Sequence, residues 1–498
     1  MNIKQVKEQI LNTVRAYLAK DENGRYLIPG RKQRPMLIMG PPGIGKTEIM
    51  SQIASELDIG LLSYSMTHHT RQSAIGLPMI CRSEYKGESF SVTQYTMSEI
   101  LASVYDLMKN SGVENGILFL DEINCISETL MPVMLQFLQY KVFGGHTLPE
   151  GWVIVTAGNP PEYNSSVREL DVATCDRLKI LSIEPDFEAW KEFAYTGGVH
   201  SAVITYLEIK PANFYRIEST AGEKHYVTAR GWDDLSRMIN VYEHLGIEVD
   251  NALVKQYITI DKVAEDFTLY YDLYKKYRND YHIGEILSGT AGEDIVQRAK
   301  NASFDERYSL LGLILNSLRE KTGRILDKSR LLVELKNALS TASQQESEGV
   351  SAADSLEQQA QSCRDKREQL ALSGGLSEFD DKMLLNKAAV LDELSRNASA
   401  GGYEGAKDDY LSKVEQLKKQ IAVVKDNYSN AFVFCENAFG EGREILILVT
   451  ELAADPSCAK FISDYGCEEY YKYDKKLMFY EHRLKVIDEI QSLSENEQ

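Results

Sequence analysis

An eight-residue motif near the start of the chain most constrains its fold. Residues 40–47 read GPPGIGKT and fit the pattern G-x-x-x-x-G-K-[ST]. An apolar run at 35–39 precedes the motif, and a helical pattern over 47–57 follows it. This strand–loop–helix context is typical of a phosphate-binding loop, in which glycines let backbone N–H groups approach an anion. The alternative, a Gly-Pro turn without a ligand, is disfavoured by that context.

The residue types of this motif suit a nucleoside triphosphate. Lys46 can place positive charge beside the β- and γ-phosphates, and Thr47 can offer its hydroxyl to Mg²⁺. The N-terminus of the following helix adds a favourable dipole for an anion. The motif therefore predicts ATP and Mg²⁺ as ligands. The predicted nucleotide-binding residues are Gly40, Pro41, Pro42, Gly43, Ile44, Gly45, Lys46, Thr47 and Glu48.

The first part of the chain alternates short apolar runs with helical patterns. Such alternation indicates a parallel sheet covered on both faces. Eleven of the 12 prolines lie at or before Pro211, as expected for a turn-rich α/β domain. The predicted strands are residues 35–39, 61–66, 117–121, 152–157 and 178–183, and the predicted helices are 3–18, 47–57, 97–110 and 128–140.

The rest of the chain is expected to be mostly helical. Residues 331–498 are acidic, with 31 acidic and 19 basic side chains. The polar segment 341–355 predicts a linker. We expect an α/β nucleotide-binding core at 1–185, a helical region at 186–300 and a helical C-terminal region at 301–498.

Two further features concern the C-terminal helices. The glycine-containing segments 371–375 and 398–402 are expected to break the helices around them. Apolar residues over 411–428 recur with spacings of three and four, which predicts a helical hairpin or a short coiled coil.

Composition excludes several classes of protein. The 498 residues are 43% hydrophobic and 26% charged, which excludes a largely disordered chain. No apolar stretch approaches the roughly 20 residues of a membrane span. Seven scattered cysteines indicate free thiols, and the first residues carry no secretory segment, so we expect a cytoplasmic protein. The net charge of −19 argues against a large basic surface for nucleic acid, although a local basic groove is compatible with it.

Polar side chains follow two of the predicted strands. Asp121 and Glu122 end the buried run in GILFLDEIN, at the edge where open α/β sheets bind ligands. Asp121 is predicted to hold Mg²⁺ through the metal's water shell, and Glu122 to orient and polarise the attacking water. Asn159 follows the run WVIVTAGN, and its amide could reach between the γ-phosphate and this water. From the local sequence, a turn-capping role before Pro160 is an equally good interpretation.

With these motifs, the chain resembles an AAA+ ATPase of the MoxR-like group over about residues 1–300. GPPGIGKT matches Walker A, LFLDEIN matches Walker B, and TAGNPPEYN matches sensor 1. CDRL at 175–178 and TARGWDDLSRMI at 228–239 support the match. The resemblance implies a five-stranded αβα core, an α-helical lid at 186–300, and a ring, usually a hexamer, with the nucleotide between subunits.

The resemblance also assigns two arginines. Arg177 matches the arginine finger that reaches the neighbour's γ-phosphate, and Arg230 matches the sensor 2 arginine of the lid. A fixed guanidinium can stabilise the charge that develops on the γ-phosphoryl oxygens. The alternatives are a surface Arg177 paired with Asp176, and an Arg230 that neutralises helix carbonyls. Leu178 stands where the family often has an aromatic residue, and Arg168 could share or take the finger role.

The sequence therefore predicts ATP hydrolysis that remodels or matures a protein client, by family resemblance a protein with a von Willebrand factor A domain. One alternative is a nucleic-acid-directed AAA+ motor of the restriction or helicase type, which the net charge disfavours. Another is a nucleotide-gated scaffold with negligible turnover, which the predicted catalytic set disfavours. That set is Glu122, Asn159, Arg177 and Arg230, and the predicted metal ligands are Thr47 and Asp121.

Overall fold

The chain folds into two compact units in a computed structural model, which describes residues 1–68, 74–85, 88–163, 172–220, 223–372, 376 and 378–475. Unit 1 comprises residues 1–189 and 357–392, and unit 2 comprises residues 190–356 and 393–498. The chain therefore passes between the units three times. All three passages lie within helices, namely α7 (Phe187–Thr196), α15 (Ala352–Leu372) and α16 (Glu378–Phe439).

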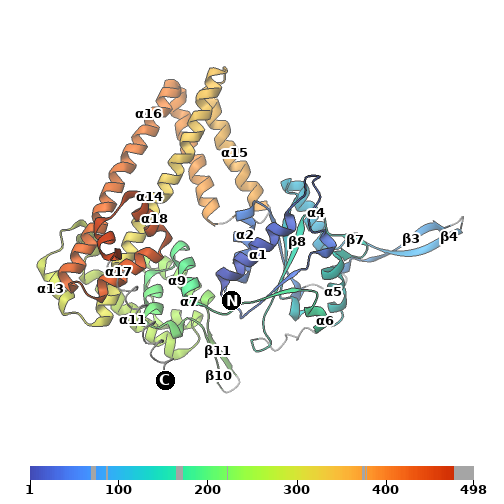
Figure 1. The fold of residues 1–498 in the computed structure, drawn as a ribbon, viewed down its shortest axis with the longest axis horizontal. Coiled ribbons are helices and arrows are strands. Elements are labelled where there is room, and N and C mark those ends of the chain that lie inside the picture. Colours follow the sequence, from blue (N-terminus) through green and yellow to red (C-terminus); the bar gives the residue numbers. More distant parts are fainter. Residues whose placement is uncertain are drawn as a thin grey trace, which may run out of the picture. The chain divides into compact units, whose positions relative to one another are not determined.

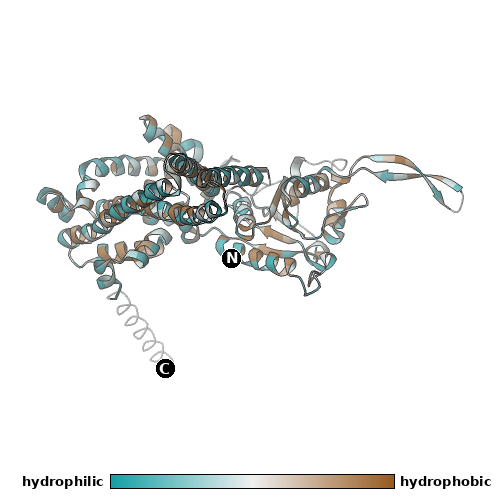
Figure 2. Cartoon of the chain, turned by 90° about the horizontal axis from the view of Figure 1, so that it is seen from above, coloured by the Kyte–Doolittle hydropathy of each residue, from teal (hydrophilic) through white to brown (hydrophobic). Residues whose placement is uncertain are grey.

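A five-stranded sheet forms the centre of unit 1 (Figure 1). Its strand order is β2-β5-β8-β1-β9, and all neighbouring strands are parallel. Much of this sheet is brown in Figure 2, the hydrophobic end of its scale, as expected for strands that are largely buried on both faces. The strands are β1 (Met36–Met39), β2 (Gly60–Ser65), β5 (Gly116–Asp121), β8 (Trp152–Gly158) and β9 (Lys179–Ser182).

Helices cover both faces of this sheet. Successive strand residues point to opposite faces, and because the central strands are almost entirely apolar, both faces must be buried. In β5, Ile117 and Phe119 pack with residues of α1 and α2, whereas Leu118 and Leu120 pack with residues of α4 and α5. The predicted αβα core is thereby confirmed. Its helices are α1 (Ile3–Leu18), α2 (Lys46–Leu57), α4 (Glu99–Ser111) and α5 (Met131–Tyr140), and the short α6 (Val172–Cys175) precedes β9.

Three antiparallel hairpins have no counterpart among the predicted elements. The longest, β3–β4, extends away from the sheet of unit 1 (Figure 1), and most of the described side chains of β4 are exposed. A strand pair outside a core lacks the continuous apolar run that predicted the sheet strands. The pairs are β3 (Pro78–Tyr85) with β4 (Glu88–Tyr95), β6 (Val142–Phe143) with β7 (His146–Thr147), and β10 (Arg216–Thr220) with β11 (Glu223–Val227).

Unit 2 is built mainly of helices, as predicted, around a core that crosses residue 300. Tyr281 and Leu287 belong to the same buried cluster as Leu310, Tyr428 and Leu448. The domain boundary predicted at residue 300 therefore has no counterpart in the packing. The helices before that point are α7 (Phe187–Thr196), α8 (Ser201–Ile209), α9 (Ala229–Leu245), α10 (Asn251–Tyr257), α11 (Asp261–Asp280), α12 (Ile283–Ser288) and α13 (Glu293–Asn301).

Long helices follow, and two of them run antiparallel. Lys321 Nζ donates to Asn427 Oδ1 at 2.6 Å, and Lys328 Nζ donates to Gln420 Oε1 at 3.0 Å. Residues 411–428 form no hairpin of their own but lie in one continuous helix that pairs with α14 (Phe304–Ser347), in agreement with the predicted alternative of a short coiled coil. None of the helices in the described ranges is long and apolar enough to cross a membrane. Two shorter helices, α17 (Arg443–Ala454) and α18 (Pro456–Tyr465), follow α16.

The linker predicted at 341–355 is wrong, because most of this segment is helical. Helix α14 continues to Ser347 and α15 begins at Ala352, with a short turn at Gly349 (φ 98°) between them. Ala342 and Ala352 are buried. The buried side chains of this segment are thus small. Because the segment is poor in large apolar residues, its sequence predicted a loop.

The two predicted helix breaks differ in the structure. Helix α15 ends at Leu372, inside the first predicted break at 371–375. Helix α16 instead continues across the second, 398–402, with a kink where Gly402 leaves helical geometry (φ 66°, ψ −164°). Glycine adopts this backbone conformation without the steric cost that a side chain would bring.

Candidate active site

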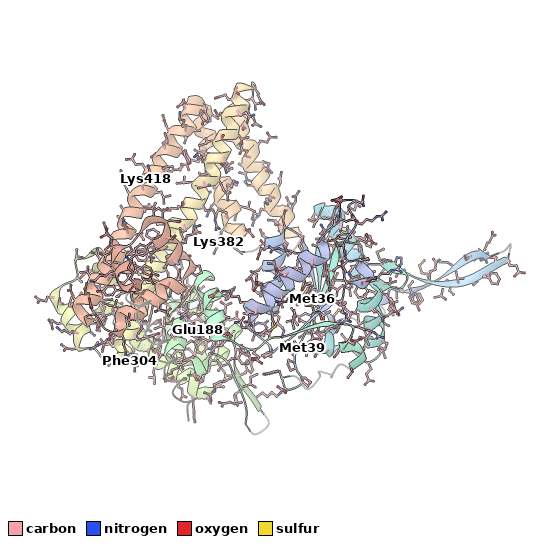
Figure 3. All side chains as sticks on the ribbon, in the orientation of Figure 1. Met36, Met39, Glu188, Phe304, Lys382 and Lys418 are labelled. Atoms are coloured by element: carbon pink, nitrogen blue, oxygen red, sulfur yellow. The ribbon has the colours of Figure 1, made fainter. Side chains whose placement is uncertain are left out.

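The glycine-rich loop, residues 40–47, connects β1 to α2 at the carboxyl edge of the sheet. Met36 and Met39, labelled in Figure 3, mark the two ends of β1. Gly43 (φ 73°) and Gly45 (φ 89°) adopt the left-handed conformation that favours glycine. Gly45 is also the N-cap of α2, so the loop and the unpaired N–H groups of that helix meet at one place. This arrangement can bind a phosphate.

Lys46, the first residue of α2, is only 8% exposed. Its Nζ donates hydrogen bonds to the carbonyl oxygens of Gly40 (2.7 Å) and Pro41 (3.0 Å) and to Oδ1 of Asn159 (2.7 Å). These three acceptors are uncharged. A phosphate that binds Lys46 competes with them and offers a stronger, charge-assisted hydrogen bond.

The other predicted loop residues differ in exposure. Pro42 and Ile44 are half-buried, whereas Glu48 is exposed in the first turn of α2. Gly40 is buried, and a Cβ atom there would lie 3.0 Å from the carbonyl oxygen of Ile183. Gly40 is therefore required by close packing of the backbone.

Thr47, Asp121 and Glu122 lie together at the end of β5. Thr47 Oγ1 donates to Asp121 Oδ2 at 3.2 Å, and the backbone N–H of Glu122 donates to Asp121 Oδ1 at 2.8 Å. Glu122 has a left-handed backbone (φ 57°), which is uncommon for a residue with a side chain. Ser65, at the end of β2, donates its hydroxyl to Glu122 Oε2 at 3.0 Å. The turn thus directs Asp121 to Thr47 and Glu122 to Ser65.

Asn159 follows β8, which lies between β1 and β5 in the sheet. This position places it between the glycine-rich loop and the two carboxylates. Its side chain contacts Lys46, and its backbone carbonyl accepts a hydrogen bond from Asn124 Nδ2 at 2.7 Å. The side chain therefore faces the phosphate-binding loop, as a sensor role requires. The role itself stays a prediction.

The acidic edge also affects a neighbouring thiol. Burial raises the pKa of Cys125, and the charges of Glu122 and Asp121 raise it further. The thiolate form, which is the nucleophile, is therefore disfavoured at Cys125. The same electronegative environment favours a bound cation.

The predicted arginines belong to other elements of the chain. Arg177 is exposed in the turn between α6 and β9 of unit 1, and its backbone N–H donates to the carbonyl of Thr174 at 3.1 Å. Arg168, the alternative finger, lies outside the described residues. Arg230 is exposed in the first turn of α9, and therefore belongs to unit 2. The finger and sensor 2 roles stay predictions.

Two polar residues of the site were missed by the sequence analysis. Ser65 contacts Glu122, and Asn124 contacts Asn159. Both left a signal in the sequence. Ser65 ends a strand at the edge where the other site residues lie, and Asn124 belongs to the same LDEIN run as the carboxylates.

Comparison with protein families identifies the domain that carries this geometry. A model described as "ATPase family associated with various cellular activities (AAA)" matches residues 36–172. Residues 36–172 thus match an AAA ATPase domain. The AAA domain includes the glycine-rich loop, Asp121, Glu122 and Asn159, and the predicted ATP binding and ATPase activity are thereby confirmed.

Solved structures with detectable similarity include two mutants of RuvB from Thermotoga maritima. One is 14% identical, covers 51% of this chain and 68% of the RuvB chain, and has a TM-score of 0.30. The other is 16% identical, covers 52% and 69%, and has a TM-score of 0.29. Similarity at this level adds nothing to the functional assignment. No curated protein matches the chain significantly.

Proposed function

We propose that this AAA ATPase belongs to the MoxR-like group, assembles into a ring, and uses hydrolysis of Mg²⁺-ATP to remodel or mature a protein client. The observation that carries the proposal is the convergence of Lys46, Asn159, Asp121 and Glu122 at one edge of the sheet. The order of motifs, with DEIN followed by GNPPEY, supports the MoxR-like group.

Each group at this edge has a distinct task. The backbone N–H groups of the loop and Lys46 hold the β- and γ-phosphates. Glu122 orients and polarises the water that attacks the γ-phosphorus, and Asn159 holds this water against the γ-phosphate. Ser65 hydrogen-bonds to Oε2 of Glu122, and the second oxygen of the carboxylate can accept from the attacking water.

Thr47 and Asp121 fit a magnesium ion. Their oxygen atoms are 3.2 Å apart, and hydroxyl and carboxylate oxygens are hard ligands. Within the described residues, no group of three or more His, Cys, Asp or Glu could hold a metal by itself. We therefore expect the ion to bind together with the nucleotide, as Mg²⁺ does in other phosphate sites. Bound there, Mg²⁺ would neutralise charge on the phosphate oxygens.

The exposed Arg177 supports an active site that is shared between subunits. A guanidinium stabilises the γ-phosphoryl charge only where it touches these oxygens. We propose that Arg177 of one subunit reaches the nucleotide of the next, and that Arg230 contributes as sensor 2.

A mixing experiment tests this shared site. Arg177→Ala should retain ATP binding and lose turnover, whereas Lys46→Ala should lose both. Mixed rings should regain part of the turnover, because some sites then combine an intact loop with an intact finger. If mixed rings form, as judged by sedimentation, and recover no activity, Arg177 is not the finger. Recovery with Arg168→Ala in its place would assign the role to Arg168.

A trapping experiment tests the client. Glu122→Gln should bind ATP without cleaving it, so a tagged variant should retain its client in lysate of the source organism. Lys46→Ala is the matched control, since it cannot enter the ATP-bound state. Enrichment of a protein with a von Willebrand factor A domain would support the proposal. Enrichment of nucleic acid or nuclease subunits would instead favour the motor, against which the net charge of −19 argues.

A cytoplasmic site of action forms part of the proposal. All seven cysteines lie in the described part of the chain, and each is a free thiol. Free thiols agree with a reducing compartment. Fractionation of cells that carry a tagged chain would test the location.

A further inference from the structure

Asn124 is buried beside the active site. It is 1% exposed and lies in the short helix η3 (Ile123–Cys125), directly after the turn that carries Glu122. Its Nδ2 donates to the backbone carbonyl of Asn159 at 2.7 Å. Its Oδ1 has no hydrogen-bond partner within the described residues.

The orientation of the Asn124 amide follows from this contact, because only the NH₂ end can donate to a carbonyl oxygen. The buried Oδ1 has a cost, since a buried acceptor without a partner destabilises the fold. An apolar residue of similar size would avoid that cost. What the site gains from asparagine is therefore the donor to Asn159.

The carbonyl of Asn159 lies beyond the paired part of β8. Strand β8 pairs with β5 up to Thr156 and with β1 up to Gly158. The pairing of β8 with β1 therefore ends one residue before Asn159, and the pairing of β8 with β5 ends three residues before it. Asn124 supplies a hydrogen bond from the β5 side at the point where the ladder no longer does.

Gly158 makes room for this contact. A Cβ atom at Gly158 would lie 2.7 Å from Oδ1 and 2.9 Å from Cγ of Asn124. The carbonyl of Gly158 also accepts a hydrogen bond from the N–H of Gly40 at 3.3 Å. The Gly158–Asn159 segment is thus held by the phosphate-binding loop on one side and by Asn124 on the other.

We propose that Asn124 is a positioning residue for ATP hydrolysis. It holds the backbone of Asn159 against the turn that carries Glu122, and so sets the distance between the Asn159 amide and the Glu122 carboxylate. The attacking water must lie in that space. This inference rests on the role proposed for Asn159, and it predicts a loss in kcat with little change in KM for ATP.

Asn124→Asp tests the donor without changing the size of the side chain. Burial against a carbonyl raises the pKa of the introduced carboxyl, whose protonated form can donate again. Relative to wild type, kcat should fall about tenfold or more at about pH 8 and recover toward about pH 6, with KM for ATP within about twofold. A pH-independent ratio, or a wild-type kcat at the higher pH, would overturn the inference.

Thr156→Val is the matched control. Thr156 Oγ1 is buried and donates to the carbonyl of Met36 at 3.1 Å, so valine also removes a buried hydrogen bond from β8. This variant should lower Tm but keep the wild-type kcat at every pH. An equal loss of kcat would mean that the stability of β8 is what matters, and the inference would fail.

Gly158→Ala reaches the same contact from the other side, and keeps the inference testable if Asn124→Asp does not fold. Its methyl group should displace the Asn124 amide and lower kcat at unchanged KM. Combined with Asn124→Ala, the methyl group keeps only the 3.1 Å contact with Sδ of Met39, so Tm should recover in large part while kcat stays low. Joint recovery of Tm and kcat would show a purely structural role and overturn the inference.

Asn159→Ala, measured beside these variants, separates the two possible failures. If Asn159→Ala keeps the wild-type kcat, the role proposed for Asn159 fails, and the inference about Asn124 fails with it. If Asn159→Ala loses kcat while Asn124→Asp keeps it, only the inference about Asn124 fails.

Discussion

Each of the two units buries a lysine, and the lysines have different partners. In unit 1, Lys46 donates to three uncharged oxygens. In unit 2, Lys191 forms ion pairs with Glu451 at 2.9 Å and with Glu208 at 3.1 Å. A phosphate is a stronger acceptor than the partners of Lys46, but no stronger in kind than the carboxylates beside Lys191. The partners of Lys46 can therefore be exchanged for a phosphate, whereas the two carboxylates hold Lys191 in a structural ion pair.

The cluster around Lys191 connects four helices of unit 2. The hydroxyl of Tyr195 donates to Glu451 at 2.6 Å, and Oε1 of Glu208 lies 3.0 Å from the same hydroxyl oxygen. Arg319 lies over the ring of Tyr195, 3.6 Å from its centroid. These residues come from α7, α8, α14 and α17, so the cluster joins sequence-distant helices inside the unit.

The largest expected effect comes from Lys46→Ala. Loss of the ammonium should reduce ATP turnover by at least about 1000-fold and abolish detectable ATP binding, because Lys46 contacts the phosphates. Tm should change little, since the three acceptors that Lys46 leaves behind are uncharged and no buried charge loses its partner. Nucleotide titration, phosphate release and thermal melting measure these effects. Wild-type affinity for ATP would refute the assignment of the loop.

Lys191→Met should show the opposite pattern. It leaves two buried carboxylates without their ammonium, which typically costs about 3–5 kcal/mol of stability. The KM for ATP should stay unchanged while Tm falls. Thermal melting and steady-state kinetics on the same preparation test this pair of outcomes. A raised KM at unchanged Tm would contradict the structural role.

Stability should also depend on pH through Glu208. Burial and the charge of Glu451 raise the pKa of Glu208 to about 7 from an ordinary value of 4.5, against the opposing charges of Lys191 and Arg319. The folded protein therefore binds this proton more tightly than the unfolded chain does. This contribution to stability is full below about pH 4.5 and is lost as the pH rises through about 7.

Glu208→Gln should remove that slope, because the amide does not titrate. Burial alone would raise the pKa of Glu451, but Lys191 and Tyr195 hold this pKa below its ordinary value. Glu451 therefore titrates at a lower pH than Glu208 does. Tm measured from about pH 5 to 8, for wild type and variant, isolates the effect of Glu208. Parallel curves would show that Glu208 does not titrate in this range.

In unit 1, Ser65→Ala should have the smallest effect of these substitutions. Removal of the hydroxyl takes a hydrogen-bond donor away from Glu122 and makes its carboxylate a slightly stronger base, so kcat should rise about two- to threefold with ATP affinity unchanged. Single-turnover hydrolysis measures this change. A large fall in kcat would instead show that Ser65 holds Glu122 in its productive position.

The sequence predicted the elements whose residues carry a strong local pattern. Each sheet strand is an apolar run, and each was located within one or two residues. The β3–β4 hairpin and the alanine-lined ends of α14 and α15 lack such a pattern, because their packing uses exposed strands or small side chains. Ala342 and Ala352 are buried, although the residues next to them in the sequence show no apolar pattern that predicts a core.

By itself, the sequence determined the chemistry of the phosphate site. Gly43 and Gly45 permit left-handed backbone, Lys46 carries charge, and Asp121 and Glu122 end a buried strand, all properties of single residues and their neighbours. Only the tertiary structure decided that β8 lies between β1 and β5, and so that Asn159 stands between the loop and the carboxylates. The same holds for Ser65, 57 residues from Glu122, and for Lys191, 260 residues from Glu451. Strand order and such distant contacts depend on the packing free energy of a whole unit, which no local pattern encodes.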